Sequence, residues 1–277
     1  MKKILSVFVL CVVLSFVSVY ILGCTSDRET PPDARSAMKY TVHGGGRVVV
    51  YDEEGNALIF DRTNSAEALE RCAEVGVGAV ELDFSFTSDG ELVCIHDWNG
   101  GFIKKAGVLT FDEFMNEKIC GYLTPMSVSD AAKFIVENKD IYMVTDVKED
   151  NIRALRIIAE ECGDDLSRVI AQIYSPEEYD AVREIGYTNI VLTLYRMKWE
   201  EKTDAAALCE FALTHELVGI TLPVMLAEQK YGLTDAFVEH GVAFFVHTVD
   251  GKEEARRYFD IGASGVYCDS TVKAATS

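Results

Sequence analysis

The sequence predicts a single α/β domain, a TIM (β/α)8 barrel, preceded by an N-terminal targeting segment. Two observations carry this prediction. Short apolar runs alternate with stretches of helical period along the chain, a pattern typical of parallel strands covered by helices. Without its leader the chain has about 250 residues, the usual size of a closed eight-stranded barrel.

The leader, 1–23, is interpreted as a lipoprotein-type signal peptide. Lys2 and Lys3 form a basic start, 4–23 carries no charge, and a small residue precedes Cys24, as in a bacterial lipobox. We expect Cys24 to be the site of lipid attachment. An uncleaved anchor is the alternative, because the apolar run is almost long enough to span a bilayer. Both arrangements predict an extracytoplasmic, membrane-anchored domain.

The rest of the chain divides into a tether and a barrel. Residues 24–37 are polar and contain adjacent prolines, which favours a tether, and 38–277 should form the barrel. Strands are expected at 40–43, 78–86, 141–146, 168–174, 189–195, 217–221, 242–247 and 264–268.

Helices and an insertion complete the predicted domain. Segments 64–76 and 150–162 have helical periodicity, and Gly76 is a stop signal for the first of them. Segment 98–125 interrupts the alternation with Gly100-Gly101, Gly107 and Pro125, so we expect an inserted loop there.

The charge and the cysteine content of the chain reduce the number of possible functions. The formal net charge is −19, which argues against a nucleic-acid partner, so an anionic substrate would need a local attraction from a metal ion or a lysine. No Cys-x-x-Cys pair occurs, so a thiolate metal site is not expected. An even number of cysteines outside the cell permits disulfides, but a chain this long does not need them. We therefore expect buried free thiols at Cys72, Cys94, Cys120, Cys162, Cys209 and Cys268.

Two pairs of charged residues follow an i, i+2 spacing on expected strands. Glu81 and Asp83 would point to the same side of their strand and would repel each other unless a cation or a proton lies between them. Such oxygen ligands suit Mg²⁺ or Ca²⁺, whereas a solvated strand edge is the structural alternative. Asp146 and Lys148 repeat the spacing; they could add a third carboxylate and a phosphate contact, or form an exposed ion pair.

Histidines stand at the ends of several expected strands. His43 follows the first strand and precedes three glycines, which allow the backbone to approach a bound group closely. His96 follows a second apolar run, and the adjacent Asp97 could orient a histidine or cap the next loop. His247 could line the same mouth or pack in its wall.

The order of these residues resembles the glycerophosphodiester phosphodiesterase family, within the phosphatidylinositol-phospholipase-C-like barrels. The matching positions are His43-Gly44, Asn64-Ser65, Glu81-x-Asp83, Ser88-Asp89-Gly90, His96-Asp97 and Asp146-x-Lys148. Near the C-terminus, 246–250 is similar to the family's Trp-Thr-Val-Asn strand and 265–269 to its final Gly-Ile-x-Thr-Asp. The resemblance therefore extends over essentially the whole mature domain.

The resemblance implies a chemistry as well as a fold. It implies a TIM barrel that binds one divalent cation, Mg²⁺ or Ca²⁺, and uses two histidines as general base and general acid. The residues that it assigns are His43 and His96 as that catalytic pair, Glu81, Asp83 and Asp146 as metal ligands, and Lys148 as a contact to the substrate phosphate.

Three positions depart from the family pattern. Gly44 stands where the family usually has an arginine, and Thr63 stands where its Glu-Asn-Thr motif supplies a ligand. Asp146 replaces a glutamate. A Glu, Asp, Asp site without the extra glutamate is similar to that of sphingomyelinase D and phospholipase D toxins.

The expected function is metal-dependent hydrolysis of glycerophosphodiesters or of lysophospholipid-type head groups. One rival is a phospholipase D-like or sphingomyelinase D-like enzyme of the same fold that acts on intact lipids. A rival of another class is a non-catalytic barrel that binds phosphorylated ligands. The expected partners are thus a small phosphodiester or a phospholipid, and a membrane through the lipid anchor.

Overall fold

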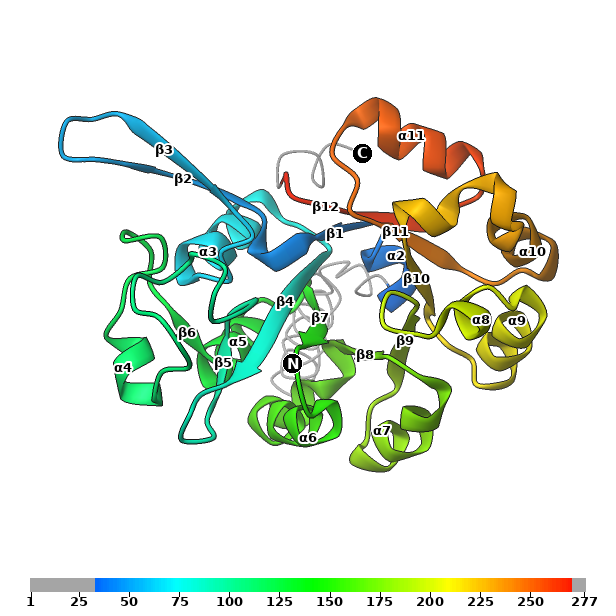
Figure 1. The fold of residues 1–277 in the computed structure, drawn as a ribbon, viewed down its shortest axis with the longest axis horizontal. Helices are drawn as coiled ribbons and strands as arrows, with labels where there is room; N and C mark the ends of the chain where they lie inside the picture. Colours follow the sequence, from blue (N-terminus) through cyan, green and yellow to red (C-terminus); the bar gives the residue numbers. More distant parts are fainter. Residues whose placement is uncertain (1–32, 271–277) are drawn as a thin grey trace, which may run out of the picture. The chain divides into compact units, whose positions relative to one another are not determined.

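Eight parallel strands form a closed barrel in the computed structural model, which describes residues 33–270 (Figure 1). In spatial order they are β1 (Tyr40–Val42), β4 (Ala79–Phe86), β7 (Tyr142–Val147), β8 (Val169–Ile173), β9 (Asn189–Thr193), β10 (Gly219–Pro223), β11 (Phe244–His247) and β12 (Gly265–Cys268). The ring closes because β1 pairs in parallel with both β12 and β4. The predicted TIM barrel is confirmed, and each expected strand corresponds to one of these eight.

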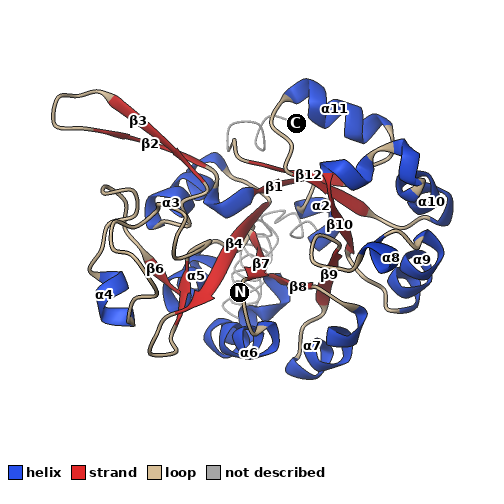
Figure 2. Ribbon diagram, in the orientation of Figure 1, coloured by secondary structure: helices blue, strands red, loops and turns tan. Residues whose placement is uncertain are grey.

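Helices lie outside the strands, as Figure 2 shows by colour. They are α3 (Ala66–Val75), α5 (Val128–Glu137), α6 (Asn151–Cys162), α7 (Tyr179–Ile185), α8 (Trp199–Lys202), α9 (Ala205–Thr214), α10 (Leu233–His240) and α11 (Lys252–Asp260). The start of α3 follows from a cap, because the Ser65 side chain accepts a hydrogen bond from the Ala68 N–H. Its end follows from Gly76, which adopts the left-handed conformation that glycine tolerates best.

A short helix, α2 (Ala34–Ala37), lies next to the amino-terminal ends of the barrel strands. Ala34 and Ala37 are buried in a cluster with side chains from the strands, and Arg35 donates hydrogen bonds to the carbonyls of Leu217 and Val218. The predicted tether, 24–37, therefore ends earlier than expected, because its last four residues pack as part of the domain.

The hairpin formed by β2 (Arg47–Tyr51) and β3 (Ala57–Asp61) is absent from the sequence-based prediction. It begins four residues after His43 and extends away from the ring of strands in Figure 1. Val49 and Ile59 pair on its exposed face. Its buried Val48 packs in the cluster that the insertion forms, so the second face of the hairpin has a partner.

The insertion after β4 contains more structure than the expected loop at 98–125. Strands β5 (Leu92–Cys94) and β6 (Met126–Ser127) extend the sheet in antiparallel fashion, and α4 (Phe111–Met115) lies between them in sequence. Trp98 and Phe114 pack edge to face in its own apolar cluster. The indole of Trp98 donates a hydrogen bond to Ser85 of β4, which connects the insertion to the barrel.

Several predictions concern residues outside the described part of the chain. The signal peptide 1–23 and Cys24 both lie there. Within 33–270, no helix combines the length and apolar character needed to cross a bilayer. Cys72, Cys94, Cys162 and Cys209 are buried thiols and Cys268 is buried as well, as predicted, whereas Cys120 in the insertion is only partly buried. Burial raises the pKa of Cys72 to about 12.

Candidate active site

Three buried carboxylates meet where β4 and β7 lie side by side. Glu81 and Asp83 alternate with apolar residues on β4, and the strand register places Asp83 opposite Asp146 of β7. One carboxylate oxygen from each residue lies within 4.8 Å of the others. The i, i+2 argument therefore predicted the convergence, and the parallel pairing of the two strands supplied the third group.

Without a cation, three buried carboxylates this close together repel one another. Burial and the neighbouring Asp83 raise the pKa of Glu81 to about 8. Glu81 has one fixed partner, since its Oε2 accepts a hydrogen bond of 2.7 Å from the Gly44 N–H. A set of three oxygen donors at this spacing suits a hard divalent cation, so the residues present fit such a group.

Lys148 lies between two of the three carboxylates. Its Nζ is 2.5 Å from Asp83 Oδ1 and 2.8 Å from Asp146 Oδ2. Burial lowers the pKa of this ammonium, but the carboxylates outweigh that effect and hold it well above its ordinary value. The ion pair that the sequence offered as the alternative for Asp146 and Lys148 does form, but in the cluster rather than on an exposed strand end.

Asp146 is held by donors from the next two strands. The hydroxyl of Tyr174, after β8, and that of Tyr195, after β9, both donate to its Oδ1, the latter at 2.8 Å. Arg196 Nη2 lies 4.0 Å from the same oxygen. Burial acts to raise the pKa of Asp146, but Lys148 and the tyrosine hydroxyls hold it below its usual value.

His43 begins a short turn (His43–Gly45) at the end of β1 and lies beside the residue that follows β12. Its Nδ1 is 3.1 Å from Asp269 Oδ1 and 3.1 Å from Thr248 Oγ1. Burial lowers the pKa of His43, but Glu81 and Asp269 outweigh burial and raise it to about 9. The ring is thus anchored through one nitrogen in an acidic environment.

The structure explains one departure from the family pattern. Gly44 has φ +57°, and a Cβ built on it would lie 2.8 Å from Arg62 Cα. Arg62 follows the hairpin, and its Nε is 3.6 Å from Asp269 Oδ2. The returning chain therefore occupies the space that any side chain at residue 44 would need.

Thr63, where the family has a glutamate, brings no carboxylate to the cluster. Its hydroxyl is 2.8 Å from that of Ser65. The next residue is closely involved instead: Asn64 Nδ2 donates to Asp83 Oδ2 at 2.8 Å, and Asn64 Oδ1 accepts from the Asp83 N–H at 2.9 Å. Asn64 therefore fixes both the main chain and the carboxylate of Asp83.

His96 lies at the end of β5, beside the barrel rather than in its ring. The N–H of Ile95 donates to the carbonyl of Asp83, which attaches this segment to β4. His96 Nδ1 is 2.8 Å from Asp97 Oδ2, and the Asn99 N–H donates to the other oxygen of Asp97. Asp97 therefore does both things considered from the sequence: it orients the histidine and caps the loop.

His247 packs in the wall of the barrel mouth. Its ring lies edge to face against Tyr195 and Tyr267, with centroids 6.1 and 5.9 Å away. Burial, with a smaller effect of His43, lowers its pKa to about 4, so the ring is neutral. This geometry supports the packing interpretation.

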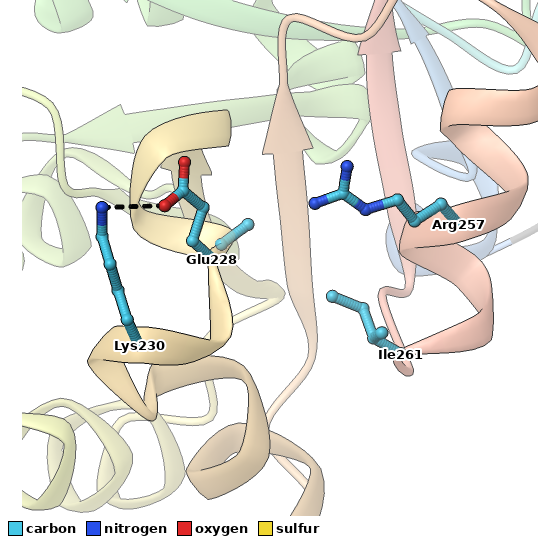
Figure 3. Close-up of a pocket in the computed structure, with 5 residues that line it drawn as sticks. Glu228, Lys230, Arg257 and Ile261 are labelled. Atoms are coloured by element: carbon cyan, nitrogen blue, oxygen red, sulfur yellow. Dashed lines mark ion pairs between the residues drawn. The ribbon is translucent and has the colours of Figure 1, made fainter.

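One pocket of the domain is separate from these residues. A pocket of about 430 Å³ lies between the segment after β10 and helix α11. Figure 3 shows its ion pair between Lys230 and Glu228, with Arg257 and Ile261 on the α11 side. None of the acidic cluster or histidine residues lines this pocket.

Sequence reasoning missed most of the supporting contacts. Asp269 and Thr248 beside His43, and Tyr174, Tyr195 and Arg196 beside Asp146, were given no role. Each of them follows a barrel strand directly or closely, so a search of all eight carboxyl strand ends would have found them.

Comparison with known proteins gives a consistent picture. Residues 55–110 match the model of the glycerophosphoryl diester phosphodiesterase family. A glycerophosphodiester phosphodiesterase of Caldanaerobacter subterraneus subsp. tengcongensis is 25% identical over 226 residues, which are 74% of this chain and 88% of the relative.

Solved structures share the fold. A glycerophosphodiester phosphodiesterase from Agrobacterium tumefaciens has a TM-score of 0.62 at 14% identity, covering 87% of this chain and all of the other. An Oleispira antarctica phosphodiesterase in complex with the product sn-glycerol-3-phosphate has a TM-score of 0.64 at 12% identity, covering 85% and 94%.

The barrel and the residues at its mouth define a phosphoric diester hydrolase of the TIM-barrel class. Within that class, the chain is similar to the glycerophosphodiester phosphodiesterase family, through the family-model match at 55–110 and the curated relative at 25% identity.

Proposed function

We propose that the protein hydrolyses glycerophosphodiesters, or diesters with lysophospholipid-type head groups, with the help of a divalent cation. One observation carries the proposal: Glu81, Asp83 and Asp146 converge at the barrel mouth with Lys148 between them. The anchored ring of His43 lies on the same side of the barrel. Buried acids with a cationic neighbour suit a phosphate ester that is bound through a metal ion.

The three carboxylates are the proposed ligands. Their oxygen donors favour Mg²⁺ or Ca²⁺, and a cation bound there would supply positive charge to the phosphoryl oxygens. Lys148 would exchange one of its carboxylate partners for a phosphoryl oxygen. Asn64 would keep Asp83 in place through its two hydrogen bonds.

Proton transfer is assigned to His43 and His96. One histidine accepts a proton from the attacking water or hydroxyl as its oxygen forms a bond to phosphorus. The other donates a proton to the alcohol oxygen as the phosphorus–oxygen bond breaks. Each transfer contributes about 10²–10⁴-fold to the rate. Asp269 holds the His43 ring through Nδ1, which leaves Nε2 for the reaction.

The named relatives support this substrate class. The Caldanaerobacter relative is a glycerophosphodiester phosphodiesterase, and the Oleispira structure holds sn-glycerol-3-phosphate as product. A phosphomonoester of glycerol is what hydrolysis of a glycerophosphodiester would release here.

A specific observation favours the alternative in which the substrate is a phospholipid. Tyr51 and Ile59 on the hairpin, and Val108 and Tyr122 on the insertion, are large apolar side chains with 48–70% exposure. Exposed apolar side chains on these two elements favour a test with lysophospholipids and intact phospholipids. Turnover of intact phospholipids would correspond to a phospholipase D-like or sphingomyelinase D-like activity.

The test incubates the protein with glycerophosphocholine, glycerophosphoethanolamine and lysophosphatidylcholine in Mg²⁺, Ca²⁺ or EDTA. Phosphorus NMR identifies the phosphate-bearing product. Turnover that requires a divalent cation and yields a glycerol phosphate supports the proposal. Binding of a diester without turnover under every condition would support the non-catalytic alternative.

We also propose that the enzyme is an extracytoplasmic lipoprotein attached to the membrane through Cys24, as the leader sequence predicts. Fractionation and mass spectrometry of the full chain test this, with Cys24→Ser as the matched variant. Lipid on Cys24 and release of the variant from membranes are expected. An unmodified, membrane-bound protein that retains 1–23 would favour the uncleaved anchor.

A further inference from the structure

Arg196 is a cation at the barrel mouth for which the proposed mechanism has no role. It lies three residues after the end of β9, in the turn that Leu194 and Met197 close through a main-chain hydrogen bond. Its guanidinium lies 4.0 Å from the ring centroid of Tyr174 and 5.2 Å from that of Tyr195. The two rings are themselves packed edge to face at 5.8 Å. Arg196 is therefore held by two aromatic side chains.

The tyrosines that hold Arg196 are fixed in turn by the acidic cluster. Both hydroxyls donate to Asp146 Oδ1, so the ring positions depend on a buried carboxylate. A guanidinium stacked on rings keeps its N–H donors in its own plane, where they can meet a ligand. Among residues 33–270 the charged neighbour of the guanidinium is Asp146, whose Oδ1 lies 4.0 Å from Nη2, too far for a hydrogen bond, and the side chain is 32% exposed. The group is thus positioned, charged and available.

The order of the strands indicates which part of a substrate it would meet. His43 follows β1, and His96 is attached to β4 through the insertion, whereas Arg196 follows β9. Around the ring, β7 and β8 separate β4 from β9 (Figure 1). The bond to be cleaved would lie on the histidine side of Asp146. Arg196 lies on the other side, where the part of the substrate beyond the phosphate would extend.

The stacking also argues against one class of head group. Aromatic faces bind quaternary ammonium groups such as choline. Here the guanidinium already covers the face of Tyr174 and approaches that of Tyr195, so this side of the mouth is cationic rather than open to a second cation. A carboxylate or phosphate suits the planar donors of an arginine much better.

We propose that Arg196 forms a subsite for an anionic head group, so that the enzyme prefers glycerophosphodiesters whose alcohol carries a phosphate or carboxylate. The inference rests on the proposed phosphodiesterase function and specifies its substrate class. Arg196 then acts in specificity, and Tyr174 and Tyr195 act as positioning residues.

A matched pair of substrates tests the inference. Glycerophosphoinositol 4-phosphate and glycerophosphoinositol differ only in a head-group phosphate, and glycerophosphocholine adds a cationic comparison. For the wild-type protein we expect kcat/KM to be about tenfold or more higher for the phosphorylated substrate than for its unphosphorylated partner, in line with a charge-assisted pair. Glycerophosphocholine should be the poorest of the three.

Substitutions of Arg196 then test whether this residue causes the substrate preference. Arg196→Gln should remove the preference by lowering kcat/KM for glycerophosphoinositol 4-phosphate alone. Arg196→Lys should keep part of it, because charge remains but the planar donors are lost. Arg71→Gln, which alters a similarly exposed arginine on α3, should change nothing. Thermal unfolding of each variant checks that it is folded.

The outcomes separate this inference from the proposed function. No turnover of any of the three diesters would contradict the proposed function. Turnover without a preference in the wild-type protein would overturn the inference alone. An equal loss on all three substrates in a folded Arg196→Gln protein would also overturn it, because that result would place Arg196 on the scissile phosphate.

Discussion

Asp83 and Asp146 lie opposite each other in the register of β4 and β7, and the ammonium of Lys148 bridges them at 2.5 and 2.8 Å. The lysine is therefore the internal counter-charge of the acidic cluster. A divalent cation that binds the same carboxylates must compete with it, and the lysine that is displaced becomes available to an anionic ligand. This exchange connects the electrostatics of the site to its proposed chemistry.

The first prediction concerns the cost of the cluster. Glu81→Gln should stabilise the cation-free protein at neutral pH by about 1–3 kcal/mol, because the raised pKa of about 8 means that folding must protonate this carboxyl, a cost that glutamine does not carry. The same variant should bind Mg²⁺ or Ca²⁺ more weakly. Urea unfolding in EDTA and isothermal titration with each metal measure the two effects. Glu74→Gln, on the exposed side of α3, is the control. A Glu81→Gln protein that is less stable than the wild-type protein in EDTA would contradict the prediction.

The second prediction is a pH dependence of stability without added cation. The folded state raises the pKa of His43 from 6.5 to about 9 and that of Glu81 from 4.5 to about 8. In both cases the folded state holds its proton to higher pH than the unfolded state. The free energy of unfolding should therefore fall as pH rises from about 5 to about 9.

Urea unfolding at a series of pH values measures this decline. His43→Gln should flatten the part between about pH 6.5 and 9, since that variant has no titrating imidazole at this position. A saturating divalent cation should flatten most of the decline, because it replaces the proton on Glu81. A stability that rises over this range in EDTA would contradict the prediction.

The third prediction separates the roles of His43 and His96. Replacing either by alanine should lower kcat on a glycerophosphodiester by about 10²–10⁴-fold. With a 4-nitrophenyl phosphodiester, whose leaving group needs no proton, one of the two variants should recover most of its activity. The recovered variant identifies the general acid. Equal defects of both variants on both substrates would contradict the division of roles.

The fourth prediction concerns Gly44 and the hairpin. Gly44→Ala should destabilise the protein by about 2–4 kcal/mol, because the new Cβ meets Arg62 at 2.8 Å and the backbone has φ +57°. Gly55→Ala has φ +84° but no neighbour within 4 Å, so it should cost only about 1 kcal/mol. The difference in urea unfolding isolates the contact with Arg62, and equal costs would show that backbone conformation alone matters.

The fifth prediction concerns Asn64, which holds Asp83. Asn64→Gly keeps a left-handed backbone possible at φ 51° but removes both side-chain hydrogen bonds. We expect a loss of about 1–3 kcal/mol of stability and weaker cation binding, because Asp83 is left without its fixed orientation. Asn116→Gly serves as a comparison, because it removes an exposed hydrogen bond from Asn116 Nδ2 to the Asp112 carbonyl at the end of α4. An unchanged metal affinity in the Asn64→Gly protein would show that Asn64 does not support cation binding through Asp83.

The fold could be predicted from local patterns because each barrel strand is a short apolar run with helical sequence on either side. The hairpin at 47–61 could not, because its strands are half exposed and one face is buried only by the insertion. The insertion at 98–125 was expected as a loop because its core consists of side chains far apart in sequence, such as Trp98 and Phe114.

The sequence by itself determined which residues carry charge on which strands: the i, i+2 spacing of Glu81 and Asp83 directs both side chains to one side. Only the tertiary structure decided how those groups are paired. Lys148 between two carboxylates, Asp269 beside His43 and Arg62 against Gly44 all join residues from different strand ends. A strand's periodicity sets the direction of its own side chains, but closure of the barrel decides which side chain of another strand they meet.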